Sequence, residues 1–205
     1  MHTGSEQLVE GALLRGDQDA IVDWVLLELR KATAPSEVVA SRAALLQRDG
    51  DVVDTDGESA VYFLVDGQEP FHVAVRHRNH MGIMTADPVV LDTLSGTLDF
   101  TSPAFATYGT AARKQLFGSE GPMVLWSGDV SNDGLLQYTG AGNDRDRLLF
   151  AIGGSVPTNT VGGYRKEDLN LDAVTKYTGT DNDRDLILFN IGGSVPTAVR
   201  HQQLP

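Results

Sequence analysis

Short apolar runs alternate with polar turn residues through the first half of the 205-residue chain. The strongest run is Ile21–Arg30, whose β-branched and aromatic residues favour a buried strand over a helix. Asp49-Gly50 separates Ala43–Arg48 from Asp51–Asp54, and this arrangement predicts a β-hairpin. Further short strands are predicted at Val61–Val65, Phe71–Arg76, Ile83–Thr85, Val89–Leu91 and Thr97–Phe100.

Turns at intervals of about 10 residues are typical of an antiparallel β-sandwich. The pattern resembles immunoglobulin-like (Ig-like) and carbohydrate-module sandwiches. We therefore expect a mostly β protein in which residues 1–121 form this sandwich. Within it, Ala111–Phe117 predicts one helical segment, and the Gly and Ser residues on either side predict a connector. Residues 122–205 then form a second domain.

The second domain contains one acidic unit written twice. The copies are Asp129–Thr158 and Asp168–Thr197, offset by 39 residues, and 18 of their 30 aligned positions are identical. Stacked solenoids need at least about three repeats for stability. We therefore expect a two-fold tandem in which each copy covers the apolar face of the other.

Each copy begins with oxygen-bearing side chains at alternate positions, which is how a short loop surrounds a hard cation such as calcium. The pattern D-x-[SN]-x-D-G resembles the calcium loop of EF-hands and, more closely, the duplicated repeats of bacterial dockerins, over residues 126–200. In such a loop, position 7 supplies a backbone carbonyl and a later acid closes the shell. The predicted Ca²⁺ ligands are Asp129, Ser131, Asp133, Leu135, Asp144 and Asp146 in the first copy, and Asp168, Asn170, Asp172, Val174, Asp183 and Asp185 in the second.

The loops depart from the EF-hand pattern at several positions. Position 12, which usually carries the closing carboxylate, is Gly140 or Gly179, so we expect one acid of each later Asn-Asp-Arg-Asp segment to close the loop. The sequence leaves open which acid does so. The second copy has Ala173 where the first has Gly134, which makes a positive φ costlier, and Lys176 at its position 9 cannot bind a cation. We expect the second copy to bind more weakly or to use a slightly different loop.

A short helix is predicted after the acids of each copy, over Arg147–Ile152 and Leu186–Ile191. The preceding Asp146 and Asp185 are good N-caps, and the Gly-Gly pair that follows each segment is a good stop signal. Helices of roughly two turns are unstable alone in water. We therefore expect the two helices to depend on each other and on the ion.

Composition excludes several classes of function. The net charge of −12 disfavours nucleic-acid binding, and the absence of cysteine excludes disulfides and thiolate metal sites. No apolar run reaches the roughly 18 residues of a membrane span. The first residues do not resemble a signal peptide, so we expect a processed piece of a longer protein rather than a cytosolic one. Common catalytic motifs are missing, and we predict no enzyme activity.

A weaker candidate site lies at the end of the Phe71–Arg76 strand. Arg76, Arg78 and Asn79 offer donors to a sugar or a carboxylate, whereas His72, His77 and His80 do not converge for zinc. The acids between residues 49 and 58 predict a solvated rim, with a third calcium site as the alternative.

These features together predict an extracellular, calcium-binding structural or adhesive protein that self-assembles into a surface fibre. The order of domains resembles the C-terminal region of large secreted bacterial surface proteins. One alternative is a dockerin-type module that anchors a larger secreted protein to another surface protein through exposed helix residues such as Arg147 and Asn190. The other is a carbohydrate-binding module that uses Trp24 and Tyr62 of the sandwich to bind a glycan.

Overall fold

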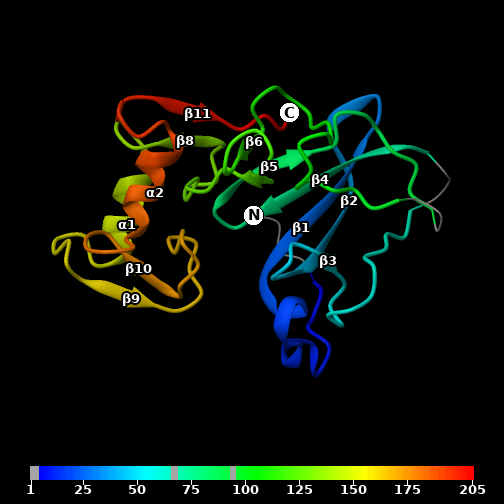
Figure 1. The fold of residues 1–205 in the computed structure, drawn as a ribbon, viewed down its shortest axis with the longest axis horizontal. Helices are drawn as coiled ribbons and strands as arrows, with labels where there is room; N and C mark the ends of the chain where they lie inside the picture. The colour runs from blue at the N-terminus through cyan, green and yellow to red at the C-terminus, as the bar shows by residue number, and fades with distance from the viewer. Residues whose placement is uncertain (1–4, 66–68, 93–95) are drawn as a thin grey trace. The chain divides into compact units, whose positions relative to one another are not determined.

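The computed structural model describes residues 5–65, 69–92 and 96–205, which are mostly β with two α-helices (Figure 1). The chain forms two compact units. The first comprises Met1–His77, Gly82–Val124 and Gln203–Pro205, and the second comprises Arg78–Met81 and Leu125–Gln202. The sequence places the domain boundary after residue 121, whereas the division in the structure follows Val124.

The first unit is built on a five-stranded antiparallel sheet with the strand order β3-β2-β1-β4-β5. Two 3₁₀ turns, Ala12–Leu14 and Asp17–Asp19, precede this sheet. Its strands are β1 Ile21–Lys31, β2 Ala34–Gln47, β3 Val52–Val53, β4 Phe71–His77 and β5 His80–Met84. The predicted strand at Ile21–Arg30 and the predicted hairpin around Asp49-Gly50 are confirmed.

One face of β1 forms the core of this unit through Val25, Leu27 and Leu29, which are all buried. Phe63 packs on this core, although residues 61–65 form no strand. The predicted strand at Val61–Val65 is therefore wrong, because apolar residues at alternate positions here cover a sheet without pairing their backbone. The next Asp-Gly pair, Asp66-Gly67, also predicts a turn from the sequence, and it lies outside the described residues.

Other predicted elements of this unit also differ from the structure. Val89–Leu91 forms only a single bridge, between Val89 and Phe71, and Thr97–Phe100 is not a strand. The helix predicted at Ala111–Phe117 is wrong, because its centre is strand β6 (Arg113–Gln115), which pairs with β7 (Met123–Leu125). The described residues before the repeats thus form one five-stranded sheet and this ribbon, and the predicted Ig-like sandwich is not confirmed.

The second unit places two helices between two β-ribbons (Figure 1). The helices are α1 (Asp144–Ala151) and α2 (Asp183–Asn190). One ribbon pairs β8 (Leu135–Gln137) with β11 (Val199–His201), and the other pairs β9 (Thr160–Gly162) with β10 (Val174–Lys176). Neither α-helix of the described residues has the length and apolar character needed to cross a membrane.

The ribbons exchange strands between the two repeats. The loop strand β8 of the first repeat pairs with β11, which follows the helix of the second repeat, and β10 of the second repeat pairs with β9, which follows the helix of the first. Two threonine hydroxyls make the same exchange: Thr139 donates to the carbonyl of Pro196 at 2.8 Å, and Thr178 donates to that of Pro157 at 3.0 Å. Each repeat is therefore completed by the other.

The apolar core of this unit is drawn from both copies. Leu148 of α1 and Ile187 of α2 are fully buried, and they pack with Leu136 of β8 and Val130 of the first loop. Gly-Gly pairs end both helices, and the N–H of the second glycine in each pair donates to a helix carbonyl at 2.8 Å. Helices of eight residues are too short to persist alone, so this shared core and these caps hold them.

Candidate cation-binding loops

The carboxylate of Asp129 is buried and organises the first loop. One oxygen accepts hydrogen bonds from the Ser131 hydroxyl at 3.3 Å and from the Asp133 N–H at 3.2 Å. The other accepts the Gly134 N–H at 3.0 Å. The loop therefore curls around its first acid, with the residues at positions 3 and 5 turned towards it.

Asp144, the first residue of α1, closes this loop. Its side chain is 1% exposed, and one oxygen accepts the N–H groups of Val130 and Ser131 at 2.9 and 3.1 Å. The other oxygen accepts the Gln137 N–H at 2.9 Å. A single carboxylate thus joins the start of the helix to both sides of the loop.

Asp146 points away from the loop. Its carboxylate pairs with Arg145 at 3.0 Å, and 60% of its side chain is exposed. Asn143 is the N-cap, since its side-chain oxygen accepts the Asp146 N–H at 2.9 Å. The prediction that Asp146 caps the helix is therefore wrong. Asn143 is the N-cap, so the helix begins three residues earlier than predicted, and Asp144 lies in its first turn, where its carboxylate reaches the loop.

The second copy repeats the bonds between backbone N–H groups and carboxylates. Asp168 accepts the N–H groups of Asp172 and Ala173 at 3.2 and 3.0 Å. Asp183, which is fully buried, accepts three backbone N–H groups of its loop at 2.6, 3.3 and 2.7 Å. Asp185 pairs with the neighbouring arginine at 2.9 Å, and the N-cap is Asn182 rather than Asp185.

The carbonyls at position 7 face the loops rather than the ribbons. In an antiparallel ladder, opposite residues alternate between hydrogen-bonded and non-bonded pairs. Because the Gln202 N–H donates to the Gly134 carbonyl at 2.8 Å, the next pair, Leu135 and His201, is the non-bonded kind. The Leu135 carbonyl therefore points towards the loop, as does its N–H, which donates to Asp133 at 2.8 Å. Val174 holds the same position in the second copy, and its N–H donates to Asp172 at 2.9 Å.

Burial and like charge make these carboxylates hard to ionise. Desolvation raises the pKa of Asp144 to about 6, with further contributions from the charges of Asp129 and Asp133, although backbone N–H groups oppose the shift. Desolvation likewise raises the pKa of Asp129, and that of Asp183 in the second copy. By contrast, hydrogen bonding from Asn143 lowers the pKa of Asp146. The acids that face the loops are thus the ones that a cation would stabilise.

Within the described residues, no group of three or more Asp, Glu, His or Cys side chains is arranged to hold a metal ion as it stands. In each loop the oxygens of the two buried acids already accept backbone N–H groups. A carboxylate oxygen has room for more than one partner, so these bonds are compatible with a cation contact on the remaining lone pairs.

The other predicted site residues, Arg76, Arg78 and Asn79, contact other residues of the protein. Arg76 pairs with Glu28 at 2.9 Å in the first unit. In the second unit, Arg78 lies over the Tyr164 ring at 4.3 Å, and the buried Asn79 donates to the Asp168 carbonyl at 2.7 Å. Sequence reasoning missed that these two residues support the second loop, because no local signal links positions so far apart in the chain.

The histidines and the acidic hairpin form no shared site among the described residues. A turn at residues 78–79 places His72 and His80 on different strands; the His72 ring bonds the Thr85 carbonyl, and His77 pairs with Asp23 at 3.0 Å. In the hairpin, a guanidinium nitrogen of Arg42 donates to both carboxylate oxygens of Asp54, each at 2.6 Å.

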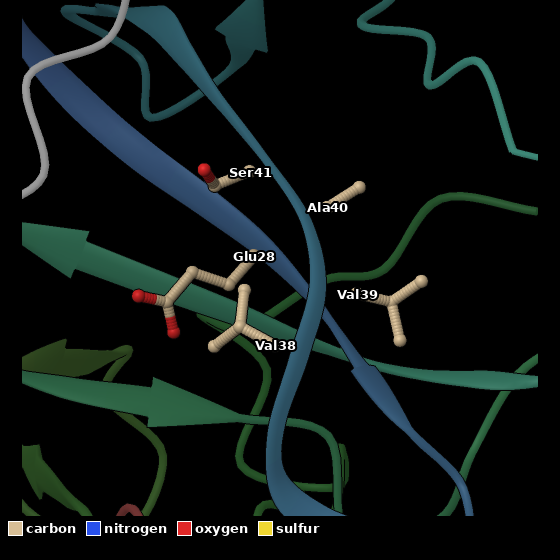
Figure 2. A pocket seen from close by; sticks show the side chains of 5 residues that line it. All are labelled: Glu28, Val38, Val39, Ala40 and Ser41. Carbon is tan, nitrogen blue, oxygen red and sulfur yellow. The ribbon is translucent and has the colours of Figure 1, made fainter.

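A pocket of about 400 Å³ lies on strands β1 and β2 (Figure 2). Figure 2 shows the Glu28 carboxylate beside Val38, with Val39, Ala40 and Ser41 along the same strand. Arg30 and Arg76 already pair with both Glu28 oxygens. The acid of this pocket is therefore neutralised within the sheet.

Comparisons of the chain with protein-family models, curated proteins and solved structures found no match.

Proposed function

We propose that the second unit is a dockerin-like calcium-binding module and that the chain is a calcium-stabilised structural or adhesive protein acting outside cells. In each repeat, the candidate ligands are the loop acids, the position-3 side chain, the position-7 carbonyl and the first acid of the helix. In the first copy the closing acid is therefore Asp144, not Asp146.

The observation that carries this proposal is the concentration of buried negative charge. Asp129 and Asp144 are almost fully buried, and the more exposed Asp133 lies close enough to raise the pKa of both. Within the described part of the chain, no Lys, Arg or His forms an ion pair with any of these three acids. Buried charges are normally paired or bound to a metal ion, and oxygen ligands of this kind suit calcium.

The rival interpretation is that the aspartates only form turns and helix caps. Turn-forming aspartates would need no ion, and removing calcium would leave the protein unchanged. The two interpretations therefore differ in a measurable way.

The test is calorimetric titration of the calcium-free protein with calcium, followed by thermal melting with and without calcium. We expect binding at about 10⁻⁴ M or tighter, which suffices for an extracellular module, and a melting temperature that rises with calcium. Asp133→Asn keeps the side-chain oxygen that accepts the Leu135 N–H but removes the charge, and it should weaken binding at least tenfold.

The matched control is Asp146→Asn, which removes an acid of the same segment that faces away from the loop. This variant should keep the wild-type affinity even if it loses some stability. No binding heat and an unchanged melt in the wild-type protein would leave the turn-and-cap interpretation standing.

A second candidate is docking through the exposed helix faces, with a second copy of this chain as the partner in a fibre. Phe150 and Phe189 hold equivalent positions on α1 and α2 and are 81% and 62% exposed, and Arg147 of α1 is exposed as well. The predicted contact residue Asn190, however, is buried and donates to the Ser127 carbonyl at 2.7 Å. Concentration-dependent size-exclusion chromatography of the wild type and Phe150→Ser tests self-association: a monomer at every concentration would remove the fibre hypothesis.

A further inference from the structure

The second loop contains positive charges that the first loop lacks. The ammonium group of Lys176 lies 3.3 Å from the carboxylate of Asp172, which holds loop position 5. A guanidinium nitrogen of Arg78 lies 4.0 Å from the carboxylate of Asp168, which holds position 1. Two of the three loop acids therefore have a cationic side chain of the protein close to a carboxylate oxygen.

The position of the first loop that matches Lys176 is neutral. Lys176 corresponds to Gln137, which is uncharged and likewise lies four residues after the acid at position 5. Among the described residues, Asp129, Asp133 and Asp144 take part in no ion pair. The two loops have the same backbone arrangement, but cationic side chains of the protein lie beside acids of the second loop only.

The side chains at position 3 also differ, because that of the second loop makes more hydrogen bonds within its loop. The Asn170 amide donates to Asp172 at 3.2 Å and to the Asp181 carbonyl at 2.9 Å, and its oxygen accepts the Asp172 N–H at 3.1 Å. The second loop is thus tied together by its own side chains. Ser131 of the first loop makes a single longer contact, to Asp129 at 3.3 Å.

We propose that Lys176 acts as a built-in counter-cation, so that the first loop binds one calcium ion whereas the second loop keeps its shape without one. This inference depends on the proposed calcium function and specifies which copy performs it. An ammonium group beside a ligand carboxylate repels an incoming divalent ion and occupies one of its oxygens. A single lysine can therefore convert a repeated ion site into a metal-free copy.

The test exchanges Gln137 and Lys176, which hold the same position in the two loops. Calcium titrations by calorimetry are made on the wild type, Gln137→Lys, Lys176→Gln and the double exchange, each with its thermal melt. We expect one ion per wild-type chain, at least tenfold weaker binding in Gln137→Lys, and a second binding event in Lys176→Gln. The double exchange should again bind one ion, now lost on Asp172→Asn instead of Asp133→Asn.

The melts without calcium show that each variant folds. They also provide a second measurement, because Lys176→Gln should lower the calcium-free melting temperature and make it recover with calcium. Two equivalent binding events in the wild type, unchanged by either substitution, would overturn this inference and leave the calcium function intact. No binding in any of the four proteins would remove the calcium function itself.

Discussion

Two residues of the second loop adopt backbone conformations that their side chains make costly. Leu171 and Ala173 have φ values of 62° and 66°, in the left-handed region. Their counterparts Asn132 and Gly134 have φ values of 57° and 79° and suit that region far better. The sequence predicts the cost at Ala173, and the structure keeps the loop shape despite it.

Relieving this strain should stabilise the protein. Ala173→Gly is expected to raise the free energy of unfolding by about 1 kcal/mol, because left-handed backbone costs a side chain about 1–2 kcal/mol and the added chain flexibility takes part of that gain back. The reverse change, Gly134→Ala, should destabilise by a similar amount through backbone strain alone. The new Cβ would not clash, because the nearest atom is the Gln202 Cβ at an ordinary 3.5 Å. Denaturant unfolding measures both; a destabilised Ala173→Gly would contradict the argument.

The raised pKa of Asp144 has a defined effect on stability. Because this pKa is about 6 in the folded protein and about 3.9 in an unfolded chain, the folded state binds the proton more tightly. The calcium-free protein should therefore lose on the order of 3 kcal/mol of stability from this group as the pH rises from about 4 to about 6.

The difference in unfolding free energy between wild type and Asp144→Asn isolates this contribution. It should change across that pH range without calcium, and carboxyl NMR titration should place the pKa of Asp144 directly. Calcium should lower this pKa and remove the loss. A difference that stays constant from pH 4 to 7 would show that Asp144 ionises as it does in an unfolded chain.

At the scale of elements, the sequence predicts a helix or strand correctly where its local pattern favours one structure. It fails where two structures or two capping residues fit the same pattern. The Ile21–Arg30 strand and the Gly-Gly helix ends follow from local chemistry. Both Asn143 and Asp146 suit an N-cap, and only the three-dimensional position of Asp144 decides between them. Ala111–Phe117 has helical composition, but pairing with β7 makes its centre a strand.

The exchanged ribbons lead to a prediction about β11. Arg200 lies opposite Leu136 in a pair of the hydrogen-bonded kind, so Arg200→Pro removes a ladder bond beside the first loop. We expect this change to weaken calcium binding by the first loop at least tenfold, although Arg200 lies in the segment that follows the second repeat.

Two controls separate the strand from the side chain. Arg200→Ala removes the contact with the Trp126 ring, at 3.4 Å, but keeps the ladder bond, so it should bind better than Arg200→Pro. Val161→Pro breaks the equivalent bond in β9, beside the second loop, and should spare binding by the first. Equal losses in all three variants would show general unfolding instead of a local effect.

At the scale of the whole chain, the division into two units lies close to the change in sequence character, but its details depend on distant packing. Arg78–Met81 belongs to the second unit and Gln203–Pro205 to the first. Each segment is only a few residues long and has no periodicity of its own. Its place is set by partners such as the Asp168 carbonyl for Asn79 and Arg30 for the Pro205 carbonyl.

The strand exchange also fixes an order of events during synthesis. The first loop is made early in its unit, yet its strand β8 stays unpaired until Val199–His201 has left the ribosome. The second loop can pair with β9 as soon as β10 has been made, since β9 precedes it in the chain. The nascent chain therefore completes its two loops in reverse order, and the loop with the least compensated charge is the last to close.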